Sequence, residues 1–221
     1  MNNQTKSFLT TCVFLFMIIM LNGCVTSSYF TLTENQKPPI VPDTIAVISG
    51  SASEIDIHLA NKLTEELSNT KFKVMSQEQI TKIIPDYPLN IINFTCEGKK
   101  FKQPYISDES KKIVDAMQSK LKVKYVLLIW NNGVGTVTYT NRYGQQSGKE
   151  VEVCILTRFL KYPEATIVGY SFFCDSKSLG YFFMINEDKK IAKTVEELLN
   201  KGVKKIVKEI VKNTENPAGK K

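Results

Sequence analysis

The stretch TIAVISGSASEIDIHLANKL, from Thr44 to Leu63, decides the fold. Residues 44–49 form a short apolar run closed by Gly50, which is typical of a strand covered on both faces. Ser53 then begins a helix with Asp56 at the capping-box position, and apolar residues recur every four positions along it. A buried strand followed at once by an amphipathic helix predicts the first half of a βαβ unit.

The sequence after this unit predicts further alternating strands and helices, followed by a region of antiparallel strands. Expected elements are a strand at 72–75, a helix capped by Ser76 with Gln79, a helix from Ser107 or Asp108, strands at 125–130, 134–139, 150–160 and 166–174, and a closing helix at about 188–213. We therefore expect one α/β (α+β) sandwich domain over residues 44–213. It has a mixed sheet with an N-terminal βαβ unit, a C-terminal antiparallel meander and a closing amphipathic helix, and a disordered basic tail follows at 214–221.

The N-terminus carries a short apolar segment followed by a cysteine. Phe8–Leu21 is uncharged and spans about 21 Å as a helix, too short for the bilayer core but suited to a signal peptide. Leu21-Asn22-Gly23-Cys24 resembles the lipobox of bacterial lipoproteins, although Asn22 departs from the small residues usual there. The resemblance implies a signal peptide at 1–23, cleavage between Gly23 and Cys24, and acylation of Cys24 by diacylglycerol and palmitate-type chains. The alternative is a plain secretory signal.

Residues 24–43 are expected to be the lipidated cysteine and a flexible tether. This stretch is polar, lacks a period and contains Pro38, Pro39 and Pro42. Val25 stands where Asp commonly marks retention at the inner membrane, so the resemblance implies the outer membrane of the cell envelope, facing the periplasm.

The order of elements resembles a group of periplasmic proteins. TIAVISG, FKVMSQEQITKII, VKYVLLIW and VEVCILTRFLKYPEATIVGYSFF follow the order seen in the curli secretion-channel lipoprotein, in lipoprotein activators of penicillin-binding proteins and in the N-terminal domain of the Tol-system periplasmic protein. The resemblance spans roughly residues 44 to 212 and lies in apolar pattern. It implies a periplasmic α/β domain and carries no catalytic or ligand-binding motif.

Residues that could perform chemistry are few. The chain has one histidine, His58, which lies at the edge of a helix face, so a histidine metal cluster cannot form. The SGSASE loop after Gly50 lacks the lysine of a phosphate loop and the spaced glycines of a dinucleotide loop. We expect no catalytic residue, metal, cofactor or small-molecule substrate, and hence no enzyme; a cell-wall hydrolase is the least favoured class.

Charge is concentrated at the C-terminus. The net charge is +7, from 29 basic and 22 acidic residues, and residues 189–221 contain ten lysines against four acids. A basic amphipathic helix can lie on anionic headgroups, but the commoner arrangement packs its apolar stripe on the sheet. Nucleic acid is not an expected partner of an exported protein.

Two of the five cysteines can face each other. Cys154 and Cys174 lie ten residues on either side of Glu164, so a hairpin centred there would place them opposite one another in an oxidising compartment. A change of one residue in the turn would move them to opposite faces. They are a possible disulfide.

Residues 86–107 form a long stretch without a clear period. Tyr87, Phe94, Phe101 and Tyr105 lie in it, and aromatic residues are enriched in interface hot spots. They are the candidate partner contacts; the alternative is a loop packed by its own aromatics.

These observations favour a non-enzymatic, lipid-anchored envelope protein that binds another envelope component in an assembly, regulatory or secretion-accessory role. It is also a possible homo-oligomer. The alternative is a subunit of a curli-type outer-membrane secretion pore. Against that alternative, residues 133–148 look too short and too polar for two membrane-crossing strands of about nine to eleven residues.

Overall fold

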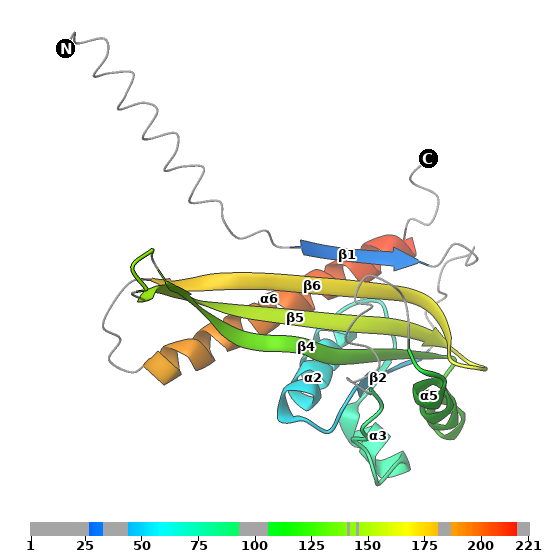
Figure 1. The fold of residues 1–221 in the computed structure, drawn as a ribbon. Helices are drawn as coiled ribbons and strands as arrows, with labels where there is room; N and C mark the ends of the chain where they lie inside the picture. Colours follow the sequence, from blue (N-terminus) through cyan, green and yellow to red (C-terminus); the bar gives the residue numbers. More distant parts are fainter. Residues whose placement is uncertain are drawn as a thin grey trace, which may run out of the picture.

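The computed structural model describes residues 27–32, 44–92, 106–140, 142–144, 146–180 and 187–215. Six strands form one mixed sheet in the order β1-β6-β5-β4-β2-β3, with four helices packed around it (Figure 1). The elements are β1 (Ser27–Leu32), β2 (Ile45–Ser49), α2 (Glu54–Ser68), β3 (Val74–Met75), α3 (Gln77–Ile83), α5 (Asp108–Leu121), β4 (Tyr125–Thr140), β5 (Gln146–Lys161), β6 (Thr166–Gly180) and α6 (Glu187–Glu215). The predicted α/β fold with a mixed sheet is confirmed.

Strand β2 is the buried core of the N-terminal unit. It runs parallel to β3 on one side and to β4 on the other, and Ile45 to Ile48 are at most 1% exposed. Both faces of this strand meet apolar side chains, because α2 covers one face and α3 and α5 cover the other. This explains why the run has no polar alternation.

The helix starts follow the expected capping chemistry. The Ser76 side chain accepts from the Gln79 N–H and the Gln79 side chain accepts from the Ser76 N–H, which completes the predicted capping box of α3. Ser107 caps α5 by accepting from the Ser110 N–H. Helix α2 begins after Ser53, as predicted, but its cap differs in one partner described below.

Strands β4, β5 and β6 form the predicted antiparallel meander, and they are longer than expected. β4 continues past Trp130 through a register shift between Asn131 and Gly133, and pairs with β5 as far as Thr140. The predicted strand at 134–139 is present, and it is the continuation of β4, because one bulge at Asn132 lets the strand bend and continue. Both strands owe their length to residues outside 133–148, since β4 begins at Tyr125 and β5 ends at Lys161, and each has 16 residues.

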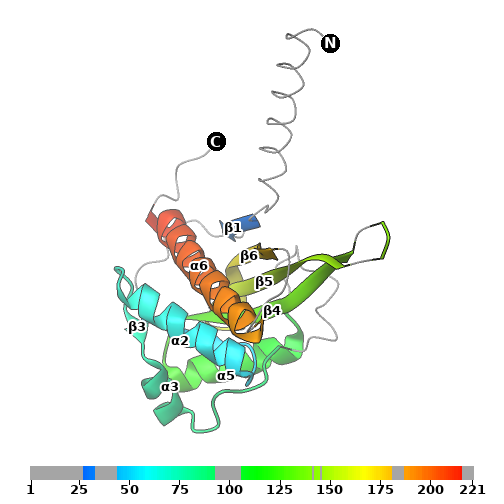
Figure 2. The same ribbon diagram turned by 90° about the vertical axis from the view of Figure 1, so that its left-hand side faces the viewer.

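The helices form two layers, one on each face of the sheet. Figure 2 shows α2 and α6 side by side over one face, with α3 and α5 lower on the molecule. The far ends of β4 and β5 run out past the helices, and we call residues 131–140 and 146–150 the projecting hairpin (Figure 2).

Helix α6 packs its apolar stripe onto the sheet, as the commoner of the two predicted arrangements required. Its buried apolar residues are Leu198, Leu199, Val203, Ile206, Val207 and Ile210. At Gly202 the helix backbone lies so close to the sheet that a Cβ would stand 2.6 Å from Ile155 and 2.7 Å from Phe173. Among the described helices, none combines the length and apolar character needed to cross a membrane.

One correction concerns the expected tether. Residues 27–32 form β1, which pairs antiparallel with β6 from Ser27 opposite Cys174 to Leu32 opposite Gly169. The prediction of an unstructured tether is therefore wrong for this part of 24–43. Its SSYFTL sequence has the aromatic and β-branched residues of a strand, and it completes a β6 edge that lies far away in the sequence.

Candidate functional site

Several of the predicted site residues lie outside the described residues. These are Gly23 and Cys24 at the proposed cleavage site, and Phe94, Phe101 and Tyr105 among the proposed partner contacts. Their assignments stay predictions. Tyr87, Cys154, Cys174 and His58 are described.

Tyr87 is a core residue and not an exposed contact, so its prediction is wrong. It is 8% exposed, its hydroxyl accepts from the Ser49 N–H at 2.9 Å, and the same hydroxyl donates to Gln77 Oε1 at 3.0 Å. Burial raises the pKa of Tyr87 and outweighs the opposing hydrogen bond with Ser49, so the hydroxyl keeps its proton for that donation. An aromatic side chain in an irregular segment can therefore be buried in the core of the domain and need not contact a partner.

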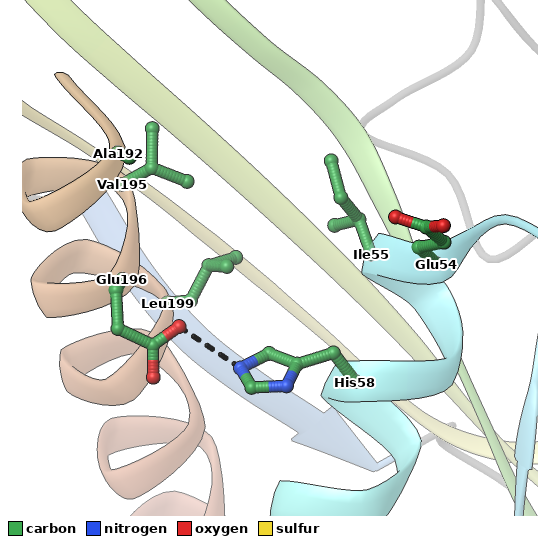
Figure 3. A pocket seen from close by; sticks show the side chains of 7 residues that line it. All are labelled: Glu54, Ile55, His58, Ala192, Val195, Glu196 and Leu199. Carbon is green, nitrogen blue, oxygen red and sulfur yellow. Dashed lines mark hydrogen bonds and ion pairs between the residues drawn. The ribbon is translucent and has the colours of Figure 1, made fainter. Parts of the chain in front are cut away.

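His58 lies in a shallow groove between α2 and α6 with a cavity volume of 390 Å³ (Figure 3). The groove is lined by Glu54, Ile55, His58, Ala192, Val195, Glu196 and Leu199. His58 Nε2 lies 2.9 Å from Glu196 Oε2, and Lys62 Nζ lies 3.0 Å from Glu196 Oε1. None of these seven lining residues is a serine, threonine or cysteine, so the groove offers no hydroxyl or thiol nucleophile.

Glu196 is the electrostatic centre of this groove. Burial acts to raise its pKa, but hydrogen bonds from Lys62 and Asn200 and the charges of His58 and Lys62 together lower it. The glutamate is therefore ionised, pairs with Lys62 and His58, and is unsuited to act as a general acid near neutral pH. The arrangement joins α2 to α6 at a surface where ion pairs are weak.

Asp56 is a buried carboxylate whose role the sequence did not indicate. It is 1% exposed, and it accepts from Ser51 Oγ at 2.5 Å and from the Asn131 N–H at 2.7 Å. Burial raises its pKa, while the hydrogen bonds from Ser51, Asn131 and Ser53 oppose that rise. Asp56 thus ties the loop before α2 to the point where β4 leaves the body, instead of completing the expected capping box.

Arg158 is a second buried charge that the sequence did not indicate. It is 2% exposed, and its guanidinium carbon lies 5.1 Å from the centre of the Trp130 ring and 5.6 Å from that of Tyr170. Its Nη1 also donates to the Thr157 carbonyl at 2.8 Å. Stacking on two aromatic rings and a carbonyl partner make this a structural cation.

The outer edge of the projecting hairpin pairs with no other strand of the described residues. β4 pairs with β2 only as far as Ile129, so within the described ranges no strand covers the outer edge of residues 131–140. That segment, NNGVGTVTYT, has no charged residue and no proline. Val137 is 41% exposed and Tyr139 is 47% exposed, so apolar side chains accompany the open edge.

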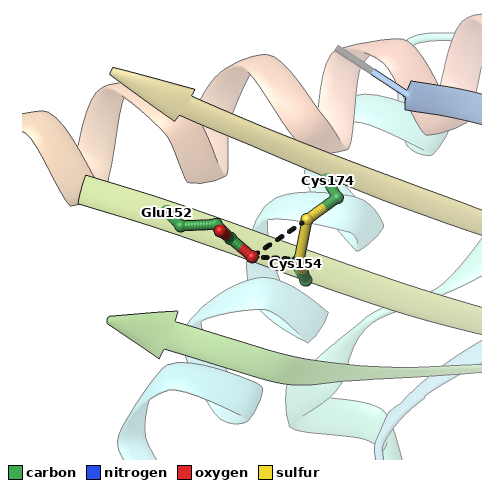
Figure 4. Close-up of side chains that lie close together, drawn as sticks. All are labelled: Glu152, Cys154 and Cys174. Carbon is green, nitrogen blue, oxygen red and sulfur yellow. Dashed lines mark hydrogen bonds between the residues drawn. A yellow bond between two sulfur atoms is a disulfide. The ribbon is translucent and has the colours of Figure 1, made fainter. Parts of the chain in front are cut away.

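Cys154 and Cys174 face each other near the base of this hairpin (Figure 4). They occupy opposite positions on β5 and β6, with Cα atoms 4.1 Å apart, and are joined by a disulfide. Glu152 lies two residues before Cys154 on the same face and points its carboxylate at both sulfurs. The turn at Tyr162 to Ala165 sets the register that brings the two cysteines together.

Comparisons with known proteins show likeness in structure alone. No family model matches the chain, and no curated protein matches it in sequence. Among similar solved structures, the PelC dodecamer from Paraburkholderia phytofirmans is 10% identical, with 81% of this chain and 97% of that chain covered and a TM-score of 0.40. Lipoprotein GNA1162 from Neisseria meningitidis is 12% identical, with 72% and 99% covered and a TM-score of 0.42. At these values the likeness carries no inference about activity or partners.

Proposed function

We propose that this chain is a non-enzymatic, lipid-anchored protein of the bacterial envelope that binds another envelope protein through the projecting hairpin. The anchor is Cys24, on the strength of the Leu21–Cys24 lipobox after a short apolar segment. The outer membrane, facing the periplasm, is the proposed location. The role is assembly, regulation or assistance to secretion.

The unpaired edge of β4 is the observation that carries the binding proposal. An exposed strand edge presents a row of N–H and C=O groups that can pair with an extended segment of another chain. Edges of this kind are usually blunted by lysine, proline or a covering element. Residues 131–140 contain neither lysine nor proline, and Val137 and Tyr139 add exposed apolar surface beside the backbone groups.

Photo-crosslinking in intact cells tests this proposal. A photoreactive amino acid at position 139 should give a crosslinked product with a distinct envelope protein, identified by mass spectrometry. The matched control is position 162, where Tyr162 is 41% exposed in the turn at the opposite end of the sheet. Val137→Lys should abolish the product at position 139 by placing a charge beside the edge. Equal crosslinking at both positions, or a product unaffected by Val137→Lys, would contradict the proposal.

Lipidation is tested separately by metabolic labelling with a fatty-acid analogue. The wild-type chain should be labelled and Cys24→Ala should not. Equal labelling of the two chains would leave a plain secretory signal as the better interpretation.

A homo-oligomeric pore subunit of the curli type is the second candidate, favoured by the length of the hairpin. Among the described residues, the pairing of β6 with β1 ends at Cys174, while β6 itself continues to Gly180 on the side of the meander opposite β4. Pairing of one copy's β4 with the next copy's β6 would continue the sheet from copy to copy. A crosslink of position 139 to a second copy, with a multiple of the chain mass in light scattering, would support this candidate over the first.

A further inference from the structure

Three electron-rich groups converge on the open face of the meander. Glu152 Oε1 lies 3.4 Å from Cys154 Sγ and 3.5 Å from Cys174 Sγ. The two cysteines come from neighbouring strands, and the three ligand atoms all lie within 4.8 Å of one another. Figure 4 shows the carboxylate turned toward both sulfurs on the face away from α6.

This arrangement lacks a donor when the cysteines are oxidised. Disulfide sulfurs carry no proton, and an ionised carboxylate only accepts hydrogen bonds. The two sulfurs and the carboxylate oxygen are all acceptors. They can be satisfied either by protons on two thiols or by a cation that lies between the three atoms. Reduction of the disulfide would therefore give the carboxylate two neighbouring thiols, which can donate to it or be replaced by a cation.

Space for an ion exists at the same place. Gly133 and Gly135 lie opposite Cys154 and Glu152 on β4, and a Cβ added at either glycine would meet no atom within 4 Å. Glu152 is exposed, so the site is reached from solvent. Helices α3 and α5 cover the other end of this face, against Val126, Leu128 and Trp130.

We propose that the reduced chain binds a thiophilic divalent cation of the zinc class through Cys154, Cys174 and Glu152. Two sulfurs and one carboxylate oxygen are a donor set that zinc accepts, and water can complete a tetrahedral shell in the open space over the glycines. The proposal is independent of the hairpin's partner.

The chemistry balances with a thiol reductant. Two equivalents of thiol, or one dithiol, open the disulfide by exchange: the protein gains two electrons and two protons, and the reductant becomes a disulfide. Cation binding then displaces the two thiol protons to solvent, forming two metal–sulfur bonds. Because the sulfurs cannot bond to each other and to the metal together, the disulfide and the metal site exclude one another.

Cadmium binding to the mature full chain is the test, because cadmium–thiolate bonds give an ultraviolet charge-transfer band. All measurements use a Cys96→Ser background, so that Cys154 and Cys174 are the thiols that can respond. The reduced chain should bind one Cd²⁺ with this band, and zinc should displace it. The same chain reoxidised to the disulfide should show no band.

Two variants locate the site. Cys174→Ser should lose the band, and Glu152→Gln should keep it with affinity reduced by about tenfold or more. Glu78→Gln, at an exposed position on α3, is the matched control and should bind as the background chain does. Circular dichroism of each reduced chain verifies that it is folded. A folded reduced chain without the band, or an undiminished band in Cys174→Ser, would overturn the proposal; unchanged affinity in Glu152→Gln would overturn the three-ligand site.

Discussion

The two ends of β4 show how one strand can serve two purposes. Residues 125–130 are buried on both faces, between α2 on one side and α3 and α5 on the other, whereas most of residues 131–140 are exposed. The composition changes at the same point, from YVLLIW to NNGVGTVTYT, a segment that is mostly threonine, glycine and asparagine. The body end of the sheet is therefore held mainly by burial and residues 135–140 mainly by backbone pairing, which is the basis of the partner contact proposed above.

The largest expected effect compares a valine-to-aspartate substitution in the buried body of the sheet, on β2, with the same substitution on the projecting hairpin. Val47→Asp places an unpaired charge in the body and should lower the free energy of unfolding by about 3 to 5 kcal/mol. Val137→Asp, on the projecting hairpin, should change it by about 0.5 kcal/mol or less. Urea unfolding of both variants measures the difference. Similar losses would mean that the hairpin is as much a part of the core as β2.

The disulfide is the strongest restraint close to the hairpin. The double substitution Cys154→Ala with Cys174→Ala should lower the free energy of unfolding by about 2 to 4 kcal/mol, because a closed loop with a sequence separation of 20 residues is released in the unfolded chain. Thermal unfolding with and without reductant verifies this. A wild-type chain whose stability is unaffected by reductant would show that the far end is already held by its backbone pairing alone.

Asp56 joins the two regions through Asn131. Asp56→Ala removes the acceptor of the Asn131 N–H and the closer of the two acceptors of Ser51, so the free energy of unfolding should fall by about 1 to 3 kcal/mol. Denaturant unfolding measures the loss, and hydrogen exchange at the Asn131 amide should rise. Unchanged protection of that amide would contradict the role of Asp56 as the link.

The same carboxylate predicts a pH dependence. Burial raises the folded-state pKa of Asp56 above the value of 3.8 for an exposed carboxyl, so its contribution to stability is complete below pH 3.8. That contribution is lost as the pH rises through the folded-state pKa. Asp56→Asn removes the titrating group. As the pH rises from 3.8, the free energy of unfolding of the Asp56→Asn chain should therefore fall less than that of the wild-type chain. Parallel stability curves would exclude the effect.

Tyr87→Phe separates a core role from a contact role. The substitution keeps the ring and removes the acceptor for the Ser49 N–H, so it should cost about 1 kcal/mol. Crosslinking through position 139 should be unchanged. A loss of crosslinking without a loss of stability would return Tyr87 to the partner surface.

The smallest expected effect is at the groove between α2 and α6. His58→Ala removes one exposed ion-pair partner of Glu196 and should change the free energy of unfolding by about 0.5 kcal/mol or less. Cell-based function should also be unchanged. Loss of function in a fully stable His58→Ala chain would contradict the non-enzymatic proposal.

Local pattern predicted much of the body and little of the far end. The capping box at Ser76, the start of α5 at Ser107 and the buried runs of β2 and β4 depend on neighbours within a few residues, so they can be inferred from sequence alone. The bulge at Asn132 and the pairing of β1 with β6 depend on strands distant in the chain. The role of Asp56 could not be predicted for the same reason, since its partner Asn131 lies 75 residues away.

The pairing of β1 with β6 has a consequence for how the molecule stands on a bilayer. Ser27 lies opposite Cys174, and β6 runs from there toward the end that carries the projecting hairpin. Under the proposed lipidation, the three steps from Cys24 to Ser27 reach at most about 10 Å. Such a short linker between the lipid anchor and the folded domain would restrict the rotation of the domain relative to the bilayer. If Cys24 carries the lipid as proposed, it would hold the hairpin end close to the lipid headgroups, with the α3–α5 end directed away from them.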